Sequence, residues 1–96
     1  MTDKVDNRET DVYISEVAKE VASNIRRLRN ERGISQRDLA AWCNFEYPNM
    51  CRIESGRTNV TLQTISRVAF ALGVDVRELF GASNVSLKKK SGKNGR

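Results

Sequence analysis

The strongest constraint on the fold is a stretch, residues 35–56, whose sequence predicts two short helices joined by a tight turn. Ser35 is a good N-cap, and Asp38 three positions later completes the pattern of a capping box. A helix therefore begins directly after Ser35. It ends near Asn44, because this residue tolerates the left-handed backbone conformation that stops a helix and turns the chain sharply.

The second helix of this pair is bounded just as closely. Pro48 fits only into the first turn of a helix, where its missing N–H costs nothing, so the helix begins near Tyr47. Gly56 can supply the left-handed residue that ends it. Helical spacing turns Met50 and Ile53 inward. The residues left facing outward are Tyr47, Asn49 and Arg52. A polar second helix after a tight turn is the build of a module that inserts a helix into the DNA major groove.

The composition of the 96 residues fits one small domain and excludes several classes of protein. The chain has no His, and Cys43 and Cys51 lack the spacing and the partners of a zinc site or a disulfide scaffold. No apolar run approaches a membrane span, and the acidic N-terminus is unlike a signal peptide. We expect a cytoplasmic protein that is not an enzyme and needs no metal, cofactor or small-molecule ligand.

The net charge of +5 is unevenly distributed along the chain. Residues 84–96 carry five bases and no acid, residues 1–20 carry six acids against three bases, and residues 21–83 carry nine bases against six acids. The central part is therefore mildly basic. This charge balance permits nucleic-acid binding but does not identify it, so the prediction of DNA binding depends on the positions of individual arginines.

Apolar residues recur at helical spacing before residue 35 and predict a first helix that ends at Gly33. Its expected inward residues are Ile14, Val17, Val21, Ile25 and Leu28. Its start is less defined, and residues 1–10 are expected to be flexible. The candidate N-caps are Thr10, Asp11 and Ser15.

Two more helices follow the central pair. Thr61 caps the fourth helix, which ends at Gly73. Asp75 caps a short fifth helix, with Glu78 completing a capping box and Gly81 closing the helix. The inward residues expected on the fourth helix are Leu62, Ile65, Val68, Ala69 and Leu72.

The sequence thus predicts an all-α domain of five helices over residues 11–82, with no strand. Residues 83–96 hold only Val85 and Leu87 as apolar anchors, which cannot offset the entropy of ordering the segment. We expect a disordered tail. It is either a basic arm that attracts phosphate or a solubilising terminus, and the second reading is favoured because short lysine runs are common.

Three segments carry a family resemblance: IRRLRNERGISQRDLA at 25–40, RIESGR at 52–57 and ALGVDVRELF at 71–80. Over about residues 20–81 the chain resembles the helix-turn-helix family of phage Cro and C1 repressors and the small bacterial regulators called XRE-like. The resemblance implies a five-helix Cro/C1 repressor-like fold that binds double-stranded DNA.

The resemblance also implies roles for individual residues. Arg29 and Glu54 match a buried ion pair that ties the first helix to the third. The positions that read bases in the family are Tyr47, Pro48, Asn49 and Arg52. The positions that match its phosphate contacts are Gln36, Ser55, Gly56 and Arg57. Arg37, which belongs with Arg26, Arg27 and Arg32 to a positive face of the chain, joins the expected phosphate contacts.

Two residues depart from the family pattern. Glu46 stands where Ser or Thr usually caps the recognition helix, and its carboxylate suits the helix dipole but repels phosphate. Pro48 has no side-chain donor and offers a base only apolar contact, such as to a thymine methyl. The remaining readers then matter more: Arg52 can bind guanine and Asn49 can pair with adenine.

We therefore expect a transcriptional regulator, a repressor that binds a palindromic operator as a homodimer with half-sites roughly 34 Å apart. The expected dimer interface comprises Phe70, Val76 and Phe80. Alternatives on the same fold are an antitoxin with a toxin partner, a restriction–modification controller and a prophage repressor. Trp42 is either an edge-of-core residue or a partner contact. Cys43 and Cys51 are either packing residues or a redox switch, with packing favoured.

Overall fold

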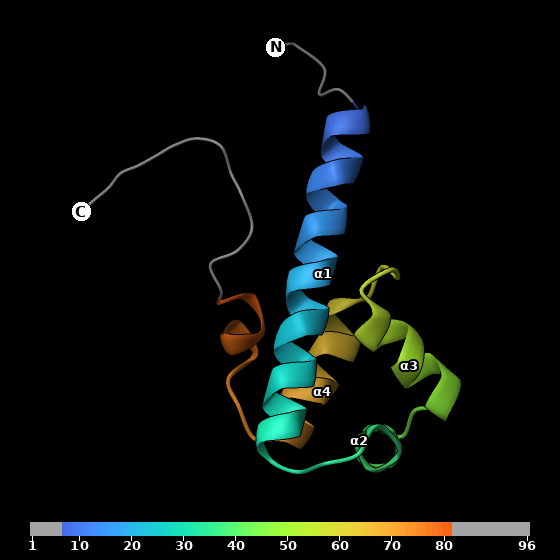
Figure 1. The fold of residues 1–96 in the computed structure, drawn as a ribbon, viewed down its shortest axis with the longest axis vertical. Helices are drawn as coiled ribbons and strands as arrows, with labels where there is room; N and C mark the ends of the chain where they lie inside the picture. The colour runs from blue at the N-terminus through green and yellow to red at the C-terminus, as the bar shows by residue number, and fades with distance from the viewer. Residues whose placement is uncertain (1–6, 82–96) are drawn as a thin grey trace, which may run out of the picture.

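The computed structural model describes residues 7–81, which form four α-helices followed by a short 3₁₀ helix (Figure 1). Their bounds are α1 (Asn7–Glu31), α2 (Gln36–Cys43), α3 (Tyr47–Ser55), α4 (Leu62–Leu72) and η1 (Val76–Phe80). The predicted all-α class is confirmed for the described part of the chain, which contains no strand. No helix within residues 7–81 is long and apolar enough to cross a membrane.

The ends of α2 and α3 agree with the local sequence signals. Ser35 Oγ accepts a hydrogen bond from the Asp38 amide at 3.0 Å, which caps α2 at its first turn. Asn44 ends α2 with a left-handed backbone, φ 61°. Gly56 ends α3 at φ 77°, and a Cβ there would lie 3.1 Å from the Cα of Lys19. Glycine is therefore needed at position 56 both for the turn and for the close approach of α3 to α1.

The segment predicted to form the fifth α-helix forms a 3₁₀ helix instead. The amide of Glu78 donates to the carbonyl of Asp75 three residues earlier, at 2.9 Å. The Asp75 carboxylate accepts from the amide of Arg77, and not from that of Glu78 as a capping box requires. Gly81 closes η1 without a left-handed turn, at φ −86°. A five-residue segment is short enough for the tighter i→i+3 pattern to persist throughout.

The start of α1 also differs from the prediction. The helix begins at Asn7, before each of the three candidate N-caps, so residues 7–10 belong to α1. No Gly or Pro interrupts this stretch, and Glu9 places a carboxylate in the first turn, where it interacts favourably with the helix dipole. Residues 1–6 and the expected tail, 83–96, lie outside the described residues.

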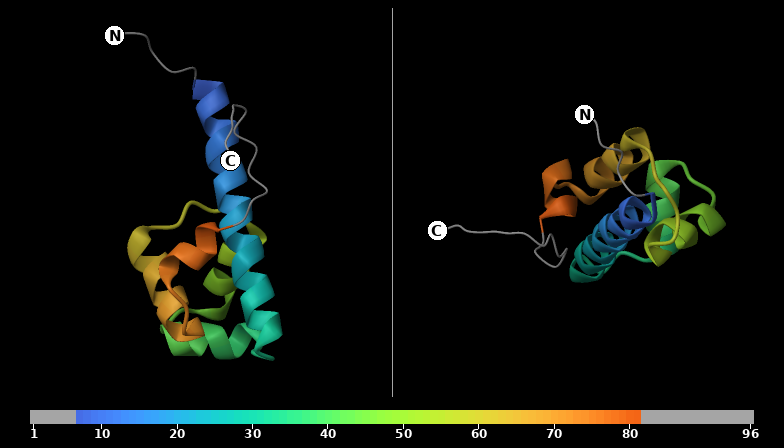
Figure 2. Two further views of the ribbon diagram at one scale, coloured as in Figure 1. Left: turned by 90° about the vertical axis from the view of Figure 1, so that its left-hand side faces the viewer. Right: turned by 90° about the horizontal axis from the view of Figure 1, so that it is seen from above.

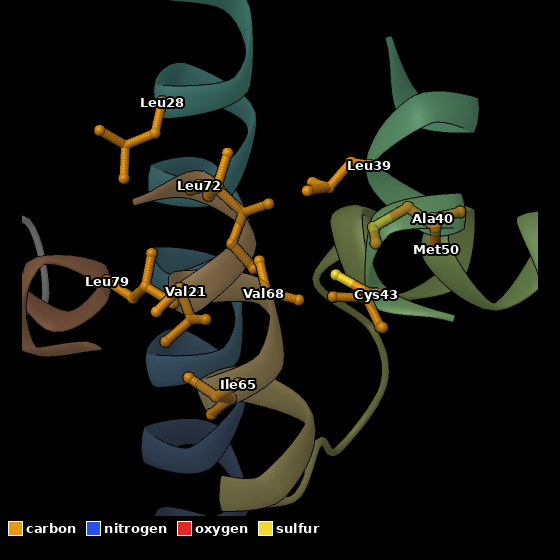
Figure 3. Close-up of a cluster of buried hydrophobic side chains, with 13 residues drawn as sticks. Val21, Leu28, Leu39, Ala40, Cys43, Met50, Ile65, Val68, Leu72 and Leu79 are labelled. Atoms are coloured by element: carbon orange, nitrogen blue, oxygen red, sulfur yellow. The ribbon is translucent and has the colours of Figure 1, made fainter. Parts of the chain in front are cut away.

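Side chains from all five helices form one hydrophobic core (Figure 3). Leu39 of α2, Met50 of α3, Val68 of α4 and Leu79 of η1 are fully buried there. Burial of such side chains is the main stabilising contribution in a domain of this size. The core therefore fixes α2 and α3 relative to the other helices.

Two residues expected to point into the core are exposed instead. Ile14 is 46% exposed, because the N-terminal half of α1 extends beyond the other helices (Figures 1 and 2). Leu62 is 75% exposed at the first position of α4. Both residues lie on the apolar side of their helices, but no buried layer covers that side at the helix end.

Candidate nucleic-acid interface

Helix α3 lies on the outside of the bundle, with α2 leading into it through a short turn (Figure 1). Met50 and Ile53 face the core, as the spacing predicts. On the outward side Pro48 and Arg52 are exposed, while Tyr47 and Asn49 are half-buried. Of the four residues expected to read bases, Tyr47, Pro48 and Arg52 line one groove, and Asn49 does not line it.

A buried charge cluster holds this helix in place. Arg29 of α1 and Glu54 of α3 form a paired contact, with Nε to Oε2 at 2.7 Å and Nη2 to Oε1 at 3.1 Å. Their side chains are only 13% and 2% exposed, respectively. Arg29 also donates through Nη1 to the carbonyl of Ile34 at 2.8 Å, so each of the three guanidinium nitrogens donates a hydrogen bond. A bidentate geometry of this kind is among the strongest ionic contacts in proteins.

Glu54 also connects to the start of α2. The amide nitrogen of Gln36 donates to Glu54 Oε1 at 3.0 Å, and the side chain of Arg26 donates to the Glu54 carbonyl. The thiol of Cys51 lies 3.8 Å from the amide oxygen of Gln36. One carboxylate therefore ties together α1, α2 and α3. The contact from Arg26 was not expected from the sequence, where this residue reads as one more base on a charged face.

The beginning of α3 carries a stacked cation. The guanidinium carbon of Arg37 lies 4.1 Å from the ring centroid of Tyr47, within the range of a cation–π contact. The neighbouring Cys51 thiol raises the pKa of the Tyr47 hydroxyl. Glu46 occupies the N-cap position with extended backbone but makes no side-chain cap hydrogen bond. Glu46 therefore stands at the family's cap position without capping α3 through its side chain.

The loop that follows α3 presents another basic side chain. Ser55 Oγ donates to the carbonyl of Arg52 at 2.6 Å and accepts from the amide of Arg57 at 3.2 Å. These bonds fix the turn around Gly56. The side chains of Arg52 and Arg57 are exposed and have no hydrogen-bond or ion-pair partner among residues 7–81. They flank a shallow groove that Tyr47, Pro48 and Thr58 also line.

The three residues expected at a dimer interface do not share one surface. Phe70 is 89% exposed and borders a groove together with Trp42, which is 58% exposed. Phe80 lines a different groove with Ile14. Val76 is half-buried and packs against the core. The pairing of Trp42 with Phe70 was missed from the sequence, although both are aromatic residues on the polar side of their helices.

The cysteines and acids of the described residues form no metal cluster. Within residues 7–81 no group of three His, Cys, Asp or Glu side chains is arranged to hold a metal ion. Cys43 is buried, and this burial raises the pKa of its thiol. A thiol with a raised pKa is a poor nucleophile, which fits a packing role.

Comparisons with known proteins point to the family. A family model described as a helix-turn-helix domain matches residues 20–80. The uncharacterized HTH-type transcriptional regulator y4dJ of Sinorhizobium fredii is 39% identical over 64 residues, which cover 67% of this chain and 83% of that protein.

Two solved structures share the fold. The restriction–modification controller protein C.AhdI from Aeromonas hydrophila is 33% identical with a TM-score of 0.63, covering 66% of this chain and 96% of its own. The hypothetical transcription factor NHTF from Neisseria is 31% identical with a TM-score of 0.66, covering 70% of this chain and 75% of its own. The chain therefore belongs to the helix-turn-helix family of transcriptional regulators.

Proposed function

We propose that this chain is a sequence-specific DNA-binding repressor that inserts α3 into the major groove. One observation carries the proposal: the Glu54 cluster fixes α3 against α1 and α2, while Arg52 on the opposite side of α3 has no partner among residues 7–81. Base recognition requires a rigidly held helix with donors turned outward. The free guanidinium of Arg52 meets this requirement.

Four side chains of α3 read the bases in this proposal. Arg52 donates to O6 and N7 of a guanine, and Asn49 pairs with an adenine. Pro48 contributes apolar contact only, as to a thymine methyl group. The protonated hydroxyl of Tyr47 donates to a base or to a neighbouring phosphate.

The phosphate contacts in this proposal flank α3 on both sides. Arg57 and Ser55 contact one strand from the loop that follows α3. Gln36 has one amide hydrogen bonded to Glu54, which leaves a second for a phosphate oxygen. Arg37, stacked on Tyr47, keeps a positive charge beside the start of α3 and offsets the repulsion between Glu46 and phosphate.

Alanine substitutions at the two unpartnered arginines should have different effects. Arg52→Ala should lose about 1–3 kcal/mol of discrimination at one base pair, because the guanidinium reads that base. Arg57→Ala should weaken binding to all duplexes alike and reduce the slope of log K against log salt by about one unit. Competition binding at several salt concentrations measures both effects. If both variants changed affinity without changing base preference, the assignment of Arg52 would be wrong.

We also propose that the chain binds its operator as a homodimer through the surface around Phe70. An aromatic ring that is 89% exposed beside the exposed Trp42 is unusual on a monomer of this size and is typical of a contact surface. A two-fold dimer places its recognition helices about 34 Å apart and thus reads an inverted repeat.

Phe70→Ser should shift the protein from dimer to monomer in sedimentation equilibrium, because it removes the most exposed apolar side chain of this surface. Leu62→Ser is the matched control, since Leu62 is 75% exposed and lines a different groove. Loss of the dimer in the control alone would move the interface to the groove of Leu62.

The similarity to a restriction–modification controller supports a second candidate role for the same DNA-binding surface. Selection of bound duplexes from a randomised pool at moderate salt tests both roles. Enrichment of an inverted repeat with one-turn spacing supports an operator-binding dimer. The position of that repeat, either upstream of restriction–modification genes or elsewhere, then separates the two roles. A pool that stays random contradicts the proposed function.

A further inference from the structure

The N-terminal half of α1 carries an apolar groove that the DNA-binding surface does not use. Helix α1 begins at Asn7, while the helix-turn-helix family model begins at residue 20, so this half of the helix precedes the matched region. Tyr13, Ile14 and Val17 line the groove from α1. Leu62 and Phe80 line it from α4 and η1.

The groove gathers much of the exposed apolar surface of the molecule. Tyr13, Ile14, Leu62 and Phe80 are all large, at least 45% exposed and adjacent to it. Apolar clusters of this kind on a small soluble domain mark a surface that binds another segment or molecule.

A row of acidic side chains runs along one side of the groove. Glu16 and Glu20 follow Tyr13 and Val17 by three residues each, so helical spacing places them beside these two groove residues. Glu20 is only 8% exposed, yet it has no hydrogen bond or ion pair among residues 7–81. Glu16 and Glu20 therefore give this side of the groove a negative charge that a cation would complement.

The chain leaves the described structure alongside this row. Asn24, four residues after Glu20 on the same side of α1, donates its amide to the carbonyl of Leu79 at 2.8 Å. Phe80 then lines the groove, and Gly81 is the last described residue. The segment after Gly81 therefore starts at the edge of the groove and beside the acidic row.

We propose that residues 82–96 of the same chain occupy this groove, with Val85 and Leu87 on its apolar floor and Lys88–Lys90 beside Glu16 and Glu20. Val85 and Leu87 are the two large apolar residues after Gly81, and the lysine run follows directly. The six residues from Gly81 to Leu87 span up to about 20 Å, and the helical rise from Val21 to Tyr13 is about 12 Å, so the reach is sufficient.

The charge of residues 82–96 favours them as the occupant over a second copy of the chain that packs its own groove against this one. Two such grooves would bring their acidic rows together, whereas the segment after residue 83 carries five bases and no acid. In this proposal Val85 and Leu87, which are too few to order the segment by themselves, pack on the apolar surface that the groove offers. Docking also keeps the lysine run beside α1 and away from the arginines of α3.

Methyl NMR of the full-length chain without DNA tests the proposal. We expect nuclear Overhauser contacts from the Leu87 methyls to Ile14 and Leu62. Ile14→Asp should remove these contacts and return the Val85 and Leu87 methyl shifts to random-coil values. Val12→Asp is the matched control, because Val12 is an exposed apolar residue of the same helix that does not line the groove, and it should leave the shifts unchanged.

Two results would overturn the proposal. Random-coil methyl shifts for Leu87 in the unsubstituted chain, without contacts to Ile14, would leave the groove without this occupant. A mixture of isotope-labelled and unlabelled chains gives the second test. Contacts between labelled and unlabelled chains would assign the groove to the tail of a second copy. Neither result tests DNA binding by α3, so a failure of the docking proposal can be distinguished from a failure of the proposed function.

Discussion

Glu54→Gln is expected to lower the free energy of unfolding by about 3–5 kcal/mol, because it leaves the buried Arg29 guanidinium without its counter-charge. Arg29 is only 13% exposed and makes two contacts with the Glu54 carboxylate. The substitution also weakens the acceptor for Gln36, which joins α2 to this cluster. A domain of this size has a total stability of only about 4–11 kcal/mol, so much of it would be lost.

Urea or thermal unfolding followed by circular dichroism measures this loss. Glu46→Gln is the matched control, since Glu46 is an exposed acid next to α3 that makes no side-chain cap hydrogen bond. The control should change stability by less than about 0.5 kcal/mol. If Glu54→Gln were as mild as the control, Arg29 and Glu54 would not be the charge pair that holds α3.

The same variant separates positioning from contact at the DNA surface. Glu54 faces the protein interior, so any change in DNA affinity measured below the unfolding transition has to act through the position of α3. We expect weaker binding to the selected operator and a smaller change for nonspecific duplexes, because base reading depends on helix position more than phosphate attraction does. Arg52→Ala, which removes a direct contact, should leave stability unchanged.

The sequence predicted α2 and α3 well because their ends are set by local chemistry. The Ser35 cap, the left-handed Asn44 and Gly56, and the position of Pro48 depend on neighbouring residues only. The η1 segment shows the limit of this reasoning, because the spacing of Asp75 and Glu78 fits an α-helix and a 3₁₀ turn equally well.

Contacts between segments far apart in the sequence were harder to predict from the sequence. Periodicity identified the apolar sides of α1 and α4 correctly, but it does not reveal whether another helix covers them, which is why Ile14 and Leu62 were misplaced. The approach of Trp42 to Phe70 joins helices that are far apart in the chain. The unpartnered burial of Glu20 likewise depends on how the chain packs around it. The Arg29 and Glu54 contact was anticipated only through the family resemblance.

Leu39→Ala is expected to destabilise the fold by about 2–5 kcal/mol, through lost burial and the cavity left behind. Leu39 is fully buried in the core between α2 and the other helices, so the surrounding side chains can relax only in part. Because α2 leads directly into α3, the same change should loosen the recognition helix. We therefore expect a lower unfolding midpoint together with weaker operator binding.

Leu62→Ala removes the same atoms from a site that is 75% exposed in the described structure. Only the proposed contact with the segment after Gly81 would cover this side chain, so the substitution should cost clearly less stability than Leu39→Ala. The pair of leucines thus tests the assignment of core and surface with identical chemistry, using denaturant unfolding of both variants under one condition. Equal losses would show that Leu62 is covered in solution. Since Leu62 lines the groove of α1, such cover would have to come from the segment proposed to dock there or from a second molecule.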